Sequence, residues 1–446
     1  MRPLLGLVFA VSLVAQQSAQ PNFEGNWQGT LNAGATRLRI AIHVTRDAQG
    51  GYVSTLDSLD QGALGIPVSK TAIAGNTLHL DIARLSAAYD GSLSADGASI
   101  EGKFNQGIAI PLALHRVTAT APLPARPQTP KPPFPYRSED VSYQGIAGTL
   151  TIPPGSGPFP AAILITGSGT HDRDETLFGH KPFLVIADFL TRQGIAVLRT
   201  DDRRTKSRSS FDALATDVLT EVDFLSSRKE IDAKKIGLIG HSEGASVGPL
   251  AASRSERVAF VVMLAVIGVT GAEVLLKQGE LVVRSQGLGD AAVAAQRRTQ
   301  EAMFAILKQE PDEQKAAEKM LAALKKIAPQ LSDDALMAQV HVANSPEIRA
   351  IINFDAAPVL RKLKIPVLAL TGSRDIQVPA SQNLPAIAAA LKEAGNRDFE
   401  THEMPGLNHL FQTCRKCTVG EYAELEETFS PGALKIIGDW SKEHVR

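Results

Sequence analysis

An apolar run that leads directly into Gly-x-Ser-x-Gly constrains the fold of this chain more than any other feature. Ile236 to Ile239 indicate a buried strand, the pentapeptide Gly240-His241-Ser242-Glu243-Gly244 follows without a break, and small residues come next, as at the start of a helix. A serine hydroxyl becomes a useful nucleophile only when a sharp turn lifts it clear of the backbone and presents it to a base. The stretch therefore predicts a strand, a tight turn with Ser242 at its tip, and a helix.

The predicted helix also offers a site for negative charge. Backbone N–H groups at its first turn would point toward Ser242, so the N–H of Glu243 is one half of a predicted oxyanion hole. The pentapeptide by itself is a weak signal, because three fixed small residues recur by chance in many chains. A glycine-rich turn without a catalytic role is the alternative, and the remainder of the sequence has to decide between the two.

Length and charge bound the classes of function. With 446 residues the chain can form two or three domains. It has 46 Lys and Arg against 47 Asp and Glu, a formal net charge of -1, so no basic or acidic field points to nucleic acid or to an anionic surface. This balance favours a small neutral or mixed substrate, with no nucleic-acid partner.

The N-terminus has the pattern of an export signal. Arg2 precedes an apolar run over 3–15, and polar residues fill 16–20. Such a run is too short to span a bilayer, so residues 1–20 are predicted to be a signal peptide, with a buried N-terminal helix as the alternative. The mature protein is then expected in the periplasm or the medium. No other segment is long and apolar enough to predict stable membrane insertion.

Residues 22–118 have the pattern of a small β-domain. Short alternating segments are separated by turn signals such as Gln49-Gly50-Gly51, which predicts six to eight strands in an antiparallel barrel or sandwich. With its Gly25-x-Trp27-x-Gly29 opening, the region resembles lipocalin-like β-domains that precede some bacterial hydrolases. We expect a structural or substrate-docking accessory. Residues 119–136 are rich in proline and are predicted to be a stiff linker.

From 137 to 446 the pattern changes to apolar strands that alternate with amphipathic helices. This predicts a mostly parallel sheet covered on both faces, an α/β fold. Residues 269–353 interrupt the alternation with helical segments and no strand candidate. We expect this insertion to form a cap over the active site, and a peripheral helical hairpin is the alternative.

Two later loops supply the partners that a nucleophilic serine needs. A serine requires a base, and the base requires an acid to orient it. Asp375 follows the predicted strand 365–370, and His409 follows the predicted strand 399–403. The order Ser, Asp, His, with each residue after a strand, is that of the α/β-hydrolase triad. We therefore predict that Ser242, His409 and Asp375 are nucleophile, base and acid.

At these loops the sequence resembles a known family. Gly372-Ser373-x-Asp375-x-x-Val378-Pro379 and Gly406-x-x-His409 are similar to the acid and histidine loops of α/β hydrolases. Further motifs are similar to exported bacterial carboxylesterases of the serine-aminopeptidase-like branch: Gly167-Ser168-Gly169, Asp172-Arg173-Asp174-Glu175, Gly179-His180-Lys181-Pro182-Phe183 and Asp201-Asp202-Arg203. Where that group continues with Gly-x-Gly, this chain has Arg204-Thr205-Lys206-Ser207.

The resemblance implies roles for residues of the first loop. It assigns the second oxyanion N–H to Ser168, with Gly169 as the nearest competitor. Gly167, Gly169 and His180 are expected near the substrate, although His180 has two possible roles, lining the pocket or holding its loop. His241 is expected to pack behind the turn, with its side chain directed away from Ser242.

The expected activity is hydrolysis of carboxylic esters with short to medium acyl chains through an acyl-enzyme, without metal or organic cofactor. A serine peptidase of the aminopeptidase or dipeptidyl-peptidase type is the first alternative. A non-catalytic surface-binding protein is the second. The only cysteines, Cys414 and Cys417, are predicted to form a local disulfide, because a zinc half-site would lack its second ligand pair. The oligomeric state is left open.

Overall fold

The computed structural model describes residues 21–445, apart from 34–35, 48, 60–62, 86, 107–108, 119–124 and 204–209. The predicted signal peptide, the first part of the predicted linker and the segment Arg204–Ser207 therefore lie outside the described residues. The chain divides into two compact units, one made of residues 1–58 and 64–121 and the other of residues 59–63 and 122–446.

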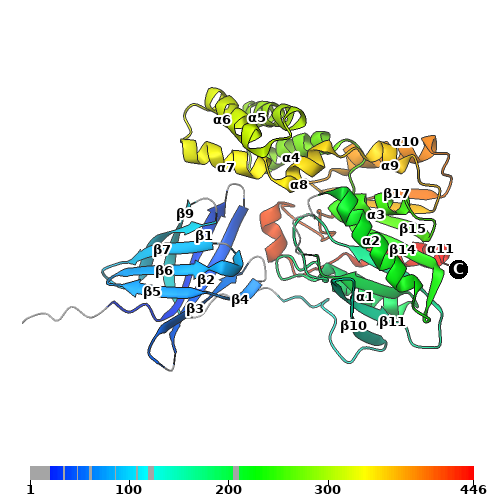
Figure 1. Ribbon diagram of the computed structural model, residues 1–446, viewed down its shortest axis with the longest axis horizontal. Helices are drawn as coiled ribbons and strands as arrows, with labels where there is room; N and C mark the ends of the chain where they lie inside the picture. The colour runs from blue at the N-terminus through cyan, green and yellow to red at the C-terminus, as the bar shows by residue number, and fades with distance from the viewer. Residues whose placement is uncertain are drawn as a thin grey trace, which may run out of the picture. The chain divides into compact units, whose positions relative to one another are not determined.

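The N-terminal unit is one antiparallel sheet of nine strands in the order β4-β3-β2-β1-β9-β8-β7-β6-β5 (Figure 1). The sheet curls, so that β5 at one end of the strand order lies beside β3 near the other end. Thr71 Oγ1 in β5 donates to Ser54 Oγ in β3 at 3.0 Å, and Val68 N–H donates to the Ser54 carbonyl at 3.1 Å. The strands are β1 Gly25–Ala33, β2 Thr36–Arg46, β3 Tyr52–Ser58, β4 Ala63–Pro67, β5 Lys70–Ala74, β6 Thr77–Ile82, β7 Ala87–Leu93, β8 Ser99–Asn105 and β9 Ala109–Val117.

Alternating side chains from these strands fill the inside of the curl. In β6, Leu78, Leu80 and Ile82 are buried and the residues between them are not. The two largest interior side chains also satisfy their polar atoms: Trp27 Nε1 donates to the Phe23 carbonyl at 2.8 Å, and the Tyr89 hydroxyl lies 3.2 Å from the Ile100 carbonyl oxygen. The sequence predicted six to eight strands, and the short strands β4 and β5 and the glycine-containing β7 raise the number to nine.

The second unit contains an eight-stranded sheet in the order β10-β11-β13-β12-β14-β15-β16-β17. Only β11 runs antiparallel to its neighbours, β10 and β13, and all other pairs are parallel. The strands are β10 Arg137–Tyr143, β11 Ile146–Ile152, β12 Phe159–Ile165, β13 Ala196–Thr200, β14 Ile231–His241, β15 Val258–Leu264, β16 Val367–Gly372 and β17 Phe399–Met404. This strand order, with the Ser242 turn directly after the inner strand β14, is the α/β-hydrolase fold.

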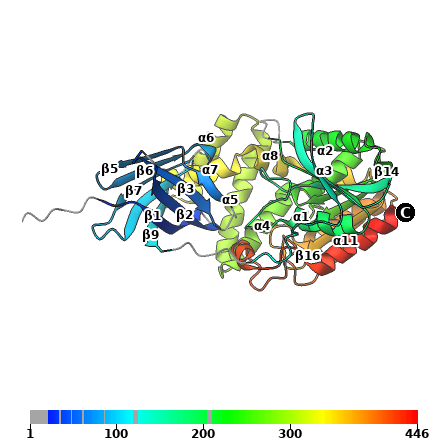
Figure 2. The ribbon, with the colours of Figure 1, turned by 90° about the horizontal axis from the view of Figure 1, so that it is seen from below.

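Helices cover both faces of this sheet (Figure 2). Alternate strand residues point to opposite sides, and apolar side chains on both sides pack against these helices. Leu238 belongs to the core beneath α2 Phe211–Ser226, α3 Glu243–Ala252, α9 Ala356–Leu360 and α10 Ala380–Glu393. Its neighbour Ile239 belongs to the opposite core, beneath α1 Pro182–Arg192 and α11 Pro431–His444. The apolar strand runs in the sequence thus correspond to strands that are buried on both sides.

The predicted helical insertion lies between β15 and β16. It consists of α4 Gly271–Ser285, α5 Asp290–Gln309, α6 Glu313–Ile327, α7 Asp333–Ala343 and α8 Pro346–Asn353. These helices bury a core of their own, which includes Phe304, Met320 and Leu336. The insertion is therefore a packed helical layer. That it closes over the active site stays a prediction.

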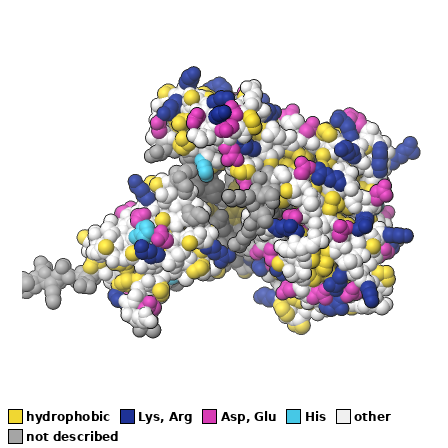
Figure 3. Space-filling view, in the orientation of Figure 1, with side chains coloured by type: hydrophobic (Ala, Val, Ile, Leu, Met, Phe, Trp, Pro, Cys, Tyr) yellow, Lys and Arg dark blue, Asp and Glu magenta, His cyan; other side chains and the backbone are white. Residues whose placement is uncertain are grey.

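Charges of both signs are mixed on the surface of the described residues. On the face shown in Figure 3, basic and acidic side chains are interspersed, as the nearly balanced charge predicts. Among the residues that the structure describes, none of the helices has the length and apolar character required to cross a membrane.

Candidate active site

Ser242 occupies a sharp turn between β14 and α3. Its backbone has φ 54° and ψ -113°, a left-handed φ that side chains other than glycine rarely adopt. The Ser242 N–H donates to the Leu264 carbonyl on β15 at 2.8 Å, which ties the turn to the next strand. The side chain is half-buried. The strand, turn and helix predicted from the sequence are all present.

The two glycines of the motif are required by close backbone contacts. A Cβ on Gly240 would lie 2.1 Å from the Gly244 carbonyl oxygen, and a Cβ on Gly244 would lie 2.1 Å from the Ile165 carbonyl oxygen. Neither contact can be relieved by a flexible side chain, since both involve backbone. The segment Gly240–Gly244, called the nucleophile turn below, therefore folds against itself and against the end of β12.

Asp375 follows β16 and is 3 % exposed. Its Oδ1 accepts the backbone N–H groups of Gln377 at 2.8 Å and Val378 at 2.9 Å. Its Oδ2 accepts from His409 Nδ1 at 2.8 Å. Three donors therefore hold the carboxylate in one orientation, which is the arrangement required of an acid that fixes a histidine tautomer.

His409 lies on the segment Pro405–Gln412, called the base loop below, which follows β17. Asn408, which is fully buried, shapes this loop by accepting the N–H groups of Leu410 at 3.0 Å and Gln412 at 2.9 Å. A Cβ on Gly372 would lie 2.2 Å from the Leu407 carbonyl oxygen, so the base loop packs directly on the end of β16. Local hydrogen bonds and a close backbone contact thus place His409 beside Asp375.

The nucleophile turn and the base loop are in direct contact. His241, the residue before Ser242, has its Nε2 3.0 Å from the His409 carbonyl oxygen, and the two histidine rings are 5.0 Å apart between centroids. The parallel strands β14, β16 and β17 end at the same edge of the sheet. The structure thus brings the predicted nucleophile, base and acid to one edge.

The loop after β12, residues Thr166–Thr170, is called the oxyanion loop below and lies beside the nucleophile turn. A Cβ on Gly167 would be 3.4 Å from the Ser242 Cβ. Ser168 and Gly169 are exposed, and Gly169 has φ +102°. Glu243, the other predicted donor, is the first residue of α3 and is buried. The roles of the Ser168 and Glu243 N–H groups stay predictions.

A buried glutamate that sequence reasoning did not single out lies behind this site. Glu175, 1 % exposed, accepts the Gly167 N–H at 2.6 Å and contacts His241 Nδ1 at 2.9 Å through the same oxygen, Oε1. Burial lowers the pKa of His241, but the charge of Glu175 and its hydrogen bond outweigh that effect, and the net pKa is raised. His241 packs behind the turn, as expected. The only sequence signal for Glu175 was its place in Asp-Arg-Asp-Glu.

His180, predicted to line the substrate pocket or to hold its loop, makes the contacts of the second role. It is 1 % exposed, with Nδ1 2.9 Å from Thr428 Oγ1 and Nε2 3.0 Å from the Tyr422 carbonyl oxygen. Burial, reinforced by the positive charge of Arg126, lowers the pKa of His180 to about 4. The ring is therefore neutral near pH 7, and it ties the segment after β12 to the segment before α11.

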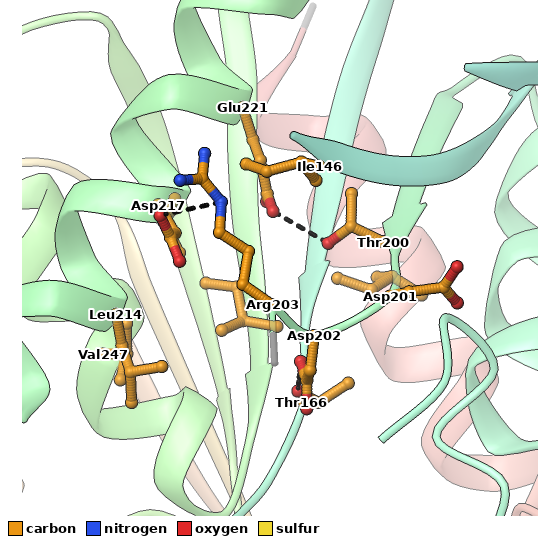
Figure 4. Close-up of a pocket in the computed structure, with 13 residues that line it drawn as sticks. Ile146, Thr166, Thr200, Asp201, Asp202, Arg203, Leu214, Asp217, Glu221 and Val247 are labelled. Carbon is orange, nitrogen blue, oxygen red and sulfur yellow. Dashed lines mark hydrogen bonds and ion pairs between the residues drawn. The ribbon is translucent and has the colours of Figure 1, made fainter. Parts of the chain in front are cut away.

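A pocket with both apolar and polar side chains lies next to the oxyanion loop, between β12, β13 and α2 (Figure 4). Thr166 Oγ1 donates to Asp202 Oδ1 at 2.8 Å, which fixes the first residue of the oxyanion loop. Glu221, on α2, accepts from Thr200 Oγ1 at 2.8 Å. Residues 204–209, which adjoin this pocket in sequence, are outside the described part of the chain.

Cys414 and Cys417 form a disulfide shortly after the base loop, as predicted. The buried carboxylate of Glu421 accepts the N–H groups of Lys416 at 2.9 Å and Cys417 at 2.6 Å, so it holds the same turn. Within the described ranges, these two cysteines and Glu421 form the only group of three potential metal ligands, and here the sulfurs are bonded to each other.

Comparison with known sequences identifies a matching family and a relative of this chain. Residues 220–413 match the family described as BAAT / Acyl-CoA thioester hydrolase C terminal. Esterase EstD from Thermotoga maritima is 31% identical over 285 residues, which are 62% of this chain and 61% of EstD. The chain thus aligns with less than two thirds of that relative's length.

Two of the solved structures that resemble this one come from Butyrivibrio proteoclasticus and Anabaena variabilis. Est1E from Butyrivibrio proteoclasticus is 16% identical with a TM-score of 0.38, and covers 69% of this chain and 98% of its own. Dienelactone hydrolase from Anabaena variabilis is 14% identical with a TM-score of 0.39, and covers 70% of this chain and 98% of its own. The α/β-hydrolase fold of the second unit is shown by its strand order and by the nucleophile turn.

Proposed function

Starting from the α/β-hydrolase fold of its second unit, we propose that this chain is a serine hydrolase that cleaves carboxylic esters with short to medium acyl chains. Ser242 Oγ attacks the ester carbonyl carbon while His409 takes its proton. The alcohol then leaves with that proton, and an acyl-enzyme on Ser242 remains. Water, deprotonated by His409, attacks the acyl-enzyme and releases the acid and free Ser242.

One observation carries this proposal. The Asp375 carboxylate, held by two backbone N–H groups, accepts from His409 Nδ1 at 2.8 Å. This bond fixes the proton on Nδ1, so that Nε2 has the free lone pair that a base needs. The left-handed backbone of Ser242 at the start of α3 supplies the second component, a half-buried hydroxyl at the positive end of a helix.

The tetrahedral intermediate would place its oxyanion between the Ser168 and Glu243 N–H groups. Each such donor stabilises the transition state by about 3 kcal/mol. The proximity of Gly167 to the Ser242 side chain supports this placement, because the oxyanion loop must approach the nucleophile closely. The similarity to esterase EstD supports an ester as substrate.

The substrate class can be tested with four sets of compounds at matched concentrations. We expect turnover of p-nitrophenyl acetate and butyrate, slower turnover of long-chain p-nitrophenyl esters, and little cleavage of aminoacyl or Xaa-Pro anilides. Butyryl-coenzyme A forms the fourth set. It is included because the family matched by residues 220–413 is named for thioester hydrolysis. Faster cleavage of an anilide than of any ester would replace the proposal with a peptidase.

The nucleophile can be tested independently of the substrate. A fluorophosphonate probe should label the wild-type protein, and mass spectrometry should locate the adduct on Ser242. Ser242→Ala should abolish both labelling and turnover while leaving the thermal unfolding curve unchanged. Full ester turnover by Ser242→Ala would reject the proposed nucleophile, and a wild-type protein that neither labels nor turns over would favour a binding protein.

The location of the protein is a separate part of the proposal: residues 1–20 direct its export. The Cys414–Cys417 disulfide supports this, since disulfides form and persist mainly in oxidising compartments. Expression of the full chain in a bacterium, followed by N-terminal sequencing of the periplasmic protein, should show removal of the segment. An uncleaved chain confined to the cytoplasm would contradict export.

A further inference from the structure

Glu175 and His241 lie directly behind the nucleophile turn and take no part in the proposed proton transfers. Oε1 of Glu175 is 2.6 Å from the Gly167 nitrogen and 2.9 Å from His241 Nδ1, and His241 Nε2 is 3.0 Å from the His409 carbonyl oxygen. These three contacts form a continuous chain. It joins the oxyanion loop to the nucleophile turn and the turn to the base loop.

The partners of His241 determine its protonation. A carboxylate oxygen and a backbone carbonyl oxygen only accept hydrogen bonds, so both ring nitrogens of His241 must donate. A neutral imidazole has one N–H and would leave one of the two contacts as a lone pair against an oxygen. The pair therefore holds one proton more than a neutral imidazole beside a carboxylate, and the raised pKa of His241 places that proton on the ring.

The surroundings of the ring agree with this assignment. His241 is 5 % exposed, and burial alone disfavours an imidazolium, so the charged form depends on nearby negative groups. Those groups are Glu175, in contact with Nδ1, and Asp375, which acts at longer range; the third ionisable group beside the ring is His409. The net effect raises the pKa of His241.

Glu175 also shows the backbone signature of a constrained residue. Its φ is 49°, a left-handed value that costs about 1–3 kcal/mol in a residue other than glycine, and its N–H donates to the Asp172 carbonyl at 2.9 Å. A buried charge on a strained backbone persists only when its contacts hold it there. The contacts that hold it lead to the oxyanion loop and the nucleophile turn.

We infer that Glu175 and protonated His241 are a positioning pair for the active site, holding the oxyanion loop and the base loop in register with Ser242. The inference rests on the proposed ester hydrolysis by Ser242. It assigns to the pair a role in catalysis that depends on pH. When His241 loses its proton, one of its two contacts must break, so the register is present at low pH and is lost as pH rises through the raised pKa of His241.

Glu175→Gln tests this directly, because glutamine keeps the shape and the acceptor for the Gly167 N–H but removes the charge. Without that charge the pKa of His241 falls, and the alkaline limb of the kcat profile should move to lower pH by about 1–3 units. At pH 8 kcat should fall by about 10–100-fold with KM nearly unchanged, since the misplaced groups act on the transition state.

Glu221→Gln is the matched control. Glu221 is also a buried glutamate of the second unit, and a glutamine oxygen can accept from Thr200 Oγ1 as the carboxylate does. This variant should keep the wild-type kcat and pH profile. The double variant Glu175→Gln/His241→Gln should lose less activity than the sum of the two single effects, because both changes break one chain of contacts.

Two further measurements separate the possible failures. Wild-type turnover and Ser242→Ala, assayed in parallel, show whether the proposed function itself holds. Ring ¹⁵N spectra of the wild-type protein at pH 7, assigned with His241→Gln, should show protons on both nitrogens of His241, whether or not the Glu175 variant folds. A neutral His241, or a folded Glu175→Gln with the wild-type kcat and alkaline limb, would overturn the positioning pair.

Discussion

The interiors of the two units differ in chemistry. Among the described residues of the N-terminal unit, the buried polar side chains are the serines Ser54 and Ser58, and the remaining core is apolar or aromatic. The second unit buries histidines, carboxylates and an arginine, among them Glu175, His180, Arg199, Glu221, His241, Asp375 and His409. Trp27 and Tyr89 are the largest buried side chains of the N-terminal unit, whereas the interior of the second unit also contains hydrogen-bonded ionisable groups.

This difference suggests which unit contributes mainly to stability and which contributes to turnover. Burying an ionisable group costs free energy unless it is paired, and replacing a whole buried ion pair with well-packed apolar groups is often neutral or stabilising. An interior built for stability therefore resembles the N-terminal unit. Of these groups, Glu175, His241, Asp375 and His409 lie at or beside the nucleophile turn and the base loop, so we expect their removal to affect turnover more than stability. Substitutions in the N-terminal unit should do the opposite.

The largest effect is expected for Asp375→Asn. Asparagine can still accept from Gln377 and Val378, but its amide would donate to His409 Nδ1 and stabilise the wrong tautomer. We expect kcat to fall by about 10³–10⁴-fold, with the melting temperature nearly unchanged. Steady-state kinetics and a thermal melt of the same preparation check both parts. Large destabilisation with modest kinetic loss would break the comparison.

Trp27→Ala is the counterpart in the N-terminal unit. Trp27 is fully buried, and its removal should destabilise this unit by about 3–5 kcal/mol. The chain has two tryptophans, so Trp440, in α11, becomes the only one and reports on the second unit by fluorescence. Calorimetry should show a lower transition for the N-terminal unit, while Trp440 fluorescence and ester turnover stay as in the wild type. A parallel loss of turnover would contradict a division of roles.

The acid sensitivity of stability should reside in the second unit. Burial lowers the pKa of His180 from 6.5 to about 4, so the unfolded chain binds a proton there that the folded chain excludes. The contribution of neutral His180 is complete above pH 6.5 and is lost as pH falls toward 4, a change of about 3 kcal/mol. His180→Gln keeps one acceptor and one donor, and should flatten this dependence in urea unfolding followed by Trp440 fluorescence, with both proteins also carrying Trp27→Ala. An equal dependence in the variant would assign it to other groups.

The sequence could predict that Ser242, Asp375 and His409 lie at one edge of the sheet, because its signals are local. Ser242 and Asp375 each follow an apolar run that predicts a buried strand, His409 follows the strand candidate 399–403, and parallel strands bring their ends to one edge. The order of the three residues along the chain then predicts their roles, which stay predictions. The glycines of the nucleophile turn are explained by backbone contacts that the motif already requires.

Features that depend on tertiary packing could not be predicted in the same way. Four residues in Asp172–Glu175 can carry a charge, and only the folded chain shows that Glu175 turns inward to Gly167. Strand β7 has Asp90 and Gly91 at positions where strand propensity is low, so its pattern is weak. Packing explains Gly91, since a Cβ there would lie 2.7 Å from the Tyr89 hydroxyl oxygen.

The smallest effect is expected for the Cys414–Cys417 disulfide, a covalent link in the unit that also has the buried charges. The two cysteines are three positions apart in sequence. Closing such a short loop raises the free energy of the unfolded chain by only about 2 kcal/mol. Glu421 holds the same turn through the N–H groups of Lys416 and Cys417, so the turn has a second constraint that does not depend on sulfur.

Cys414→Ser/Cys417→Ser should therefore lower the free energy of unfolding by about 2 kcal/mol or less and leave kcat within about twofold, because the base loop is shaped by Asn408. Adding Glu421→Gln to this variant removes the second constraint and should cost more stability than it does in the wild-type background. Urea unfolding of the four proteins measures that coupling. A large loss of kcat in the double serine variant would mean that the disulfide positions His409. The disulfide would then contribute to turnover and not only to stability.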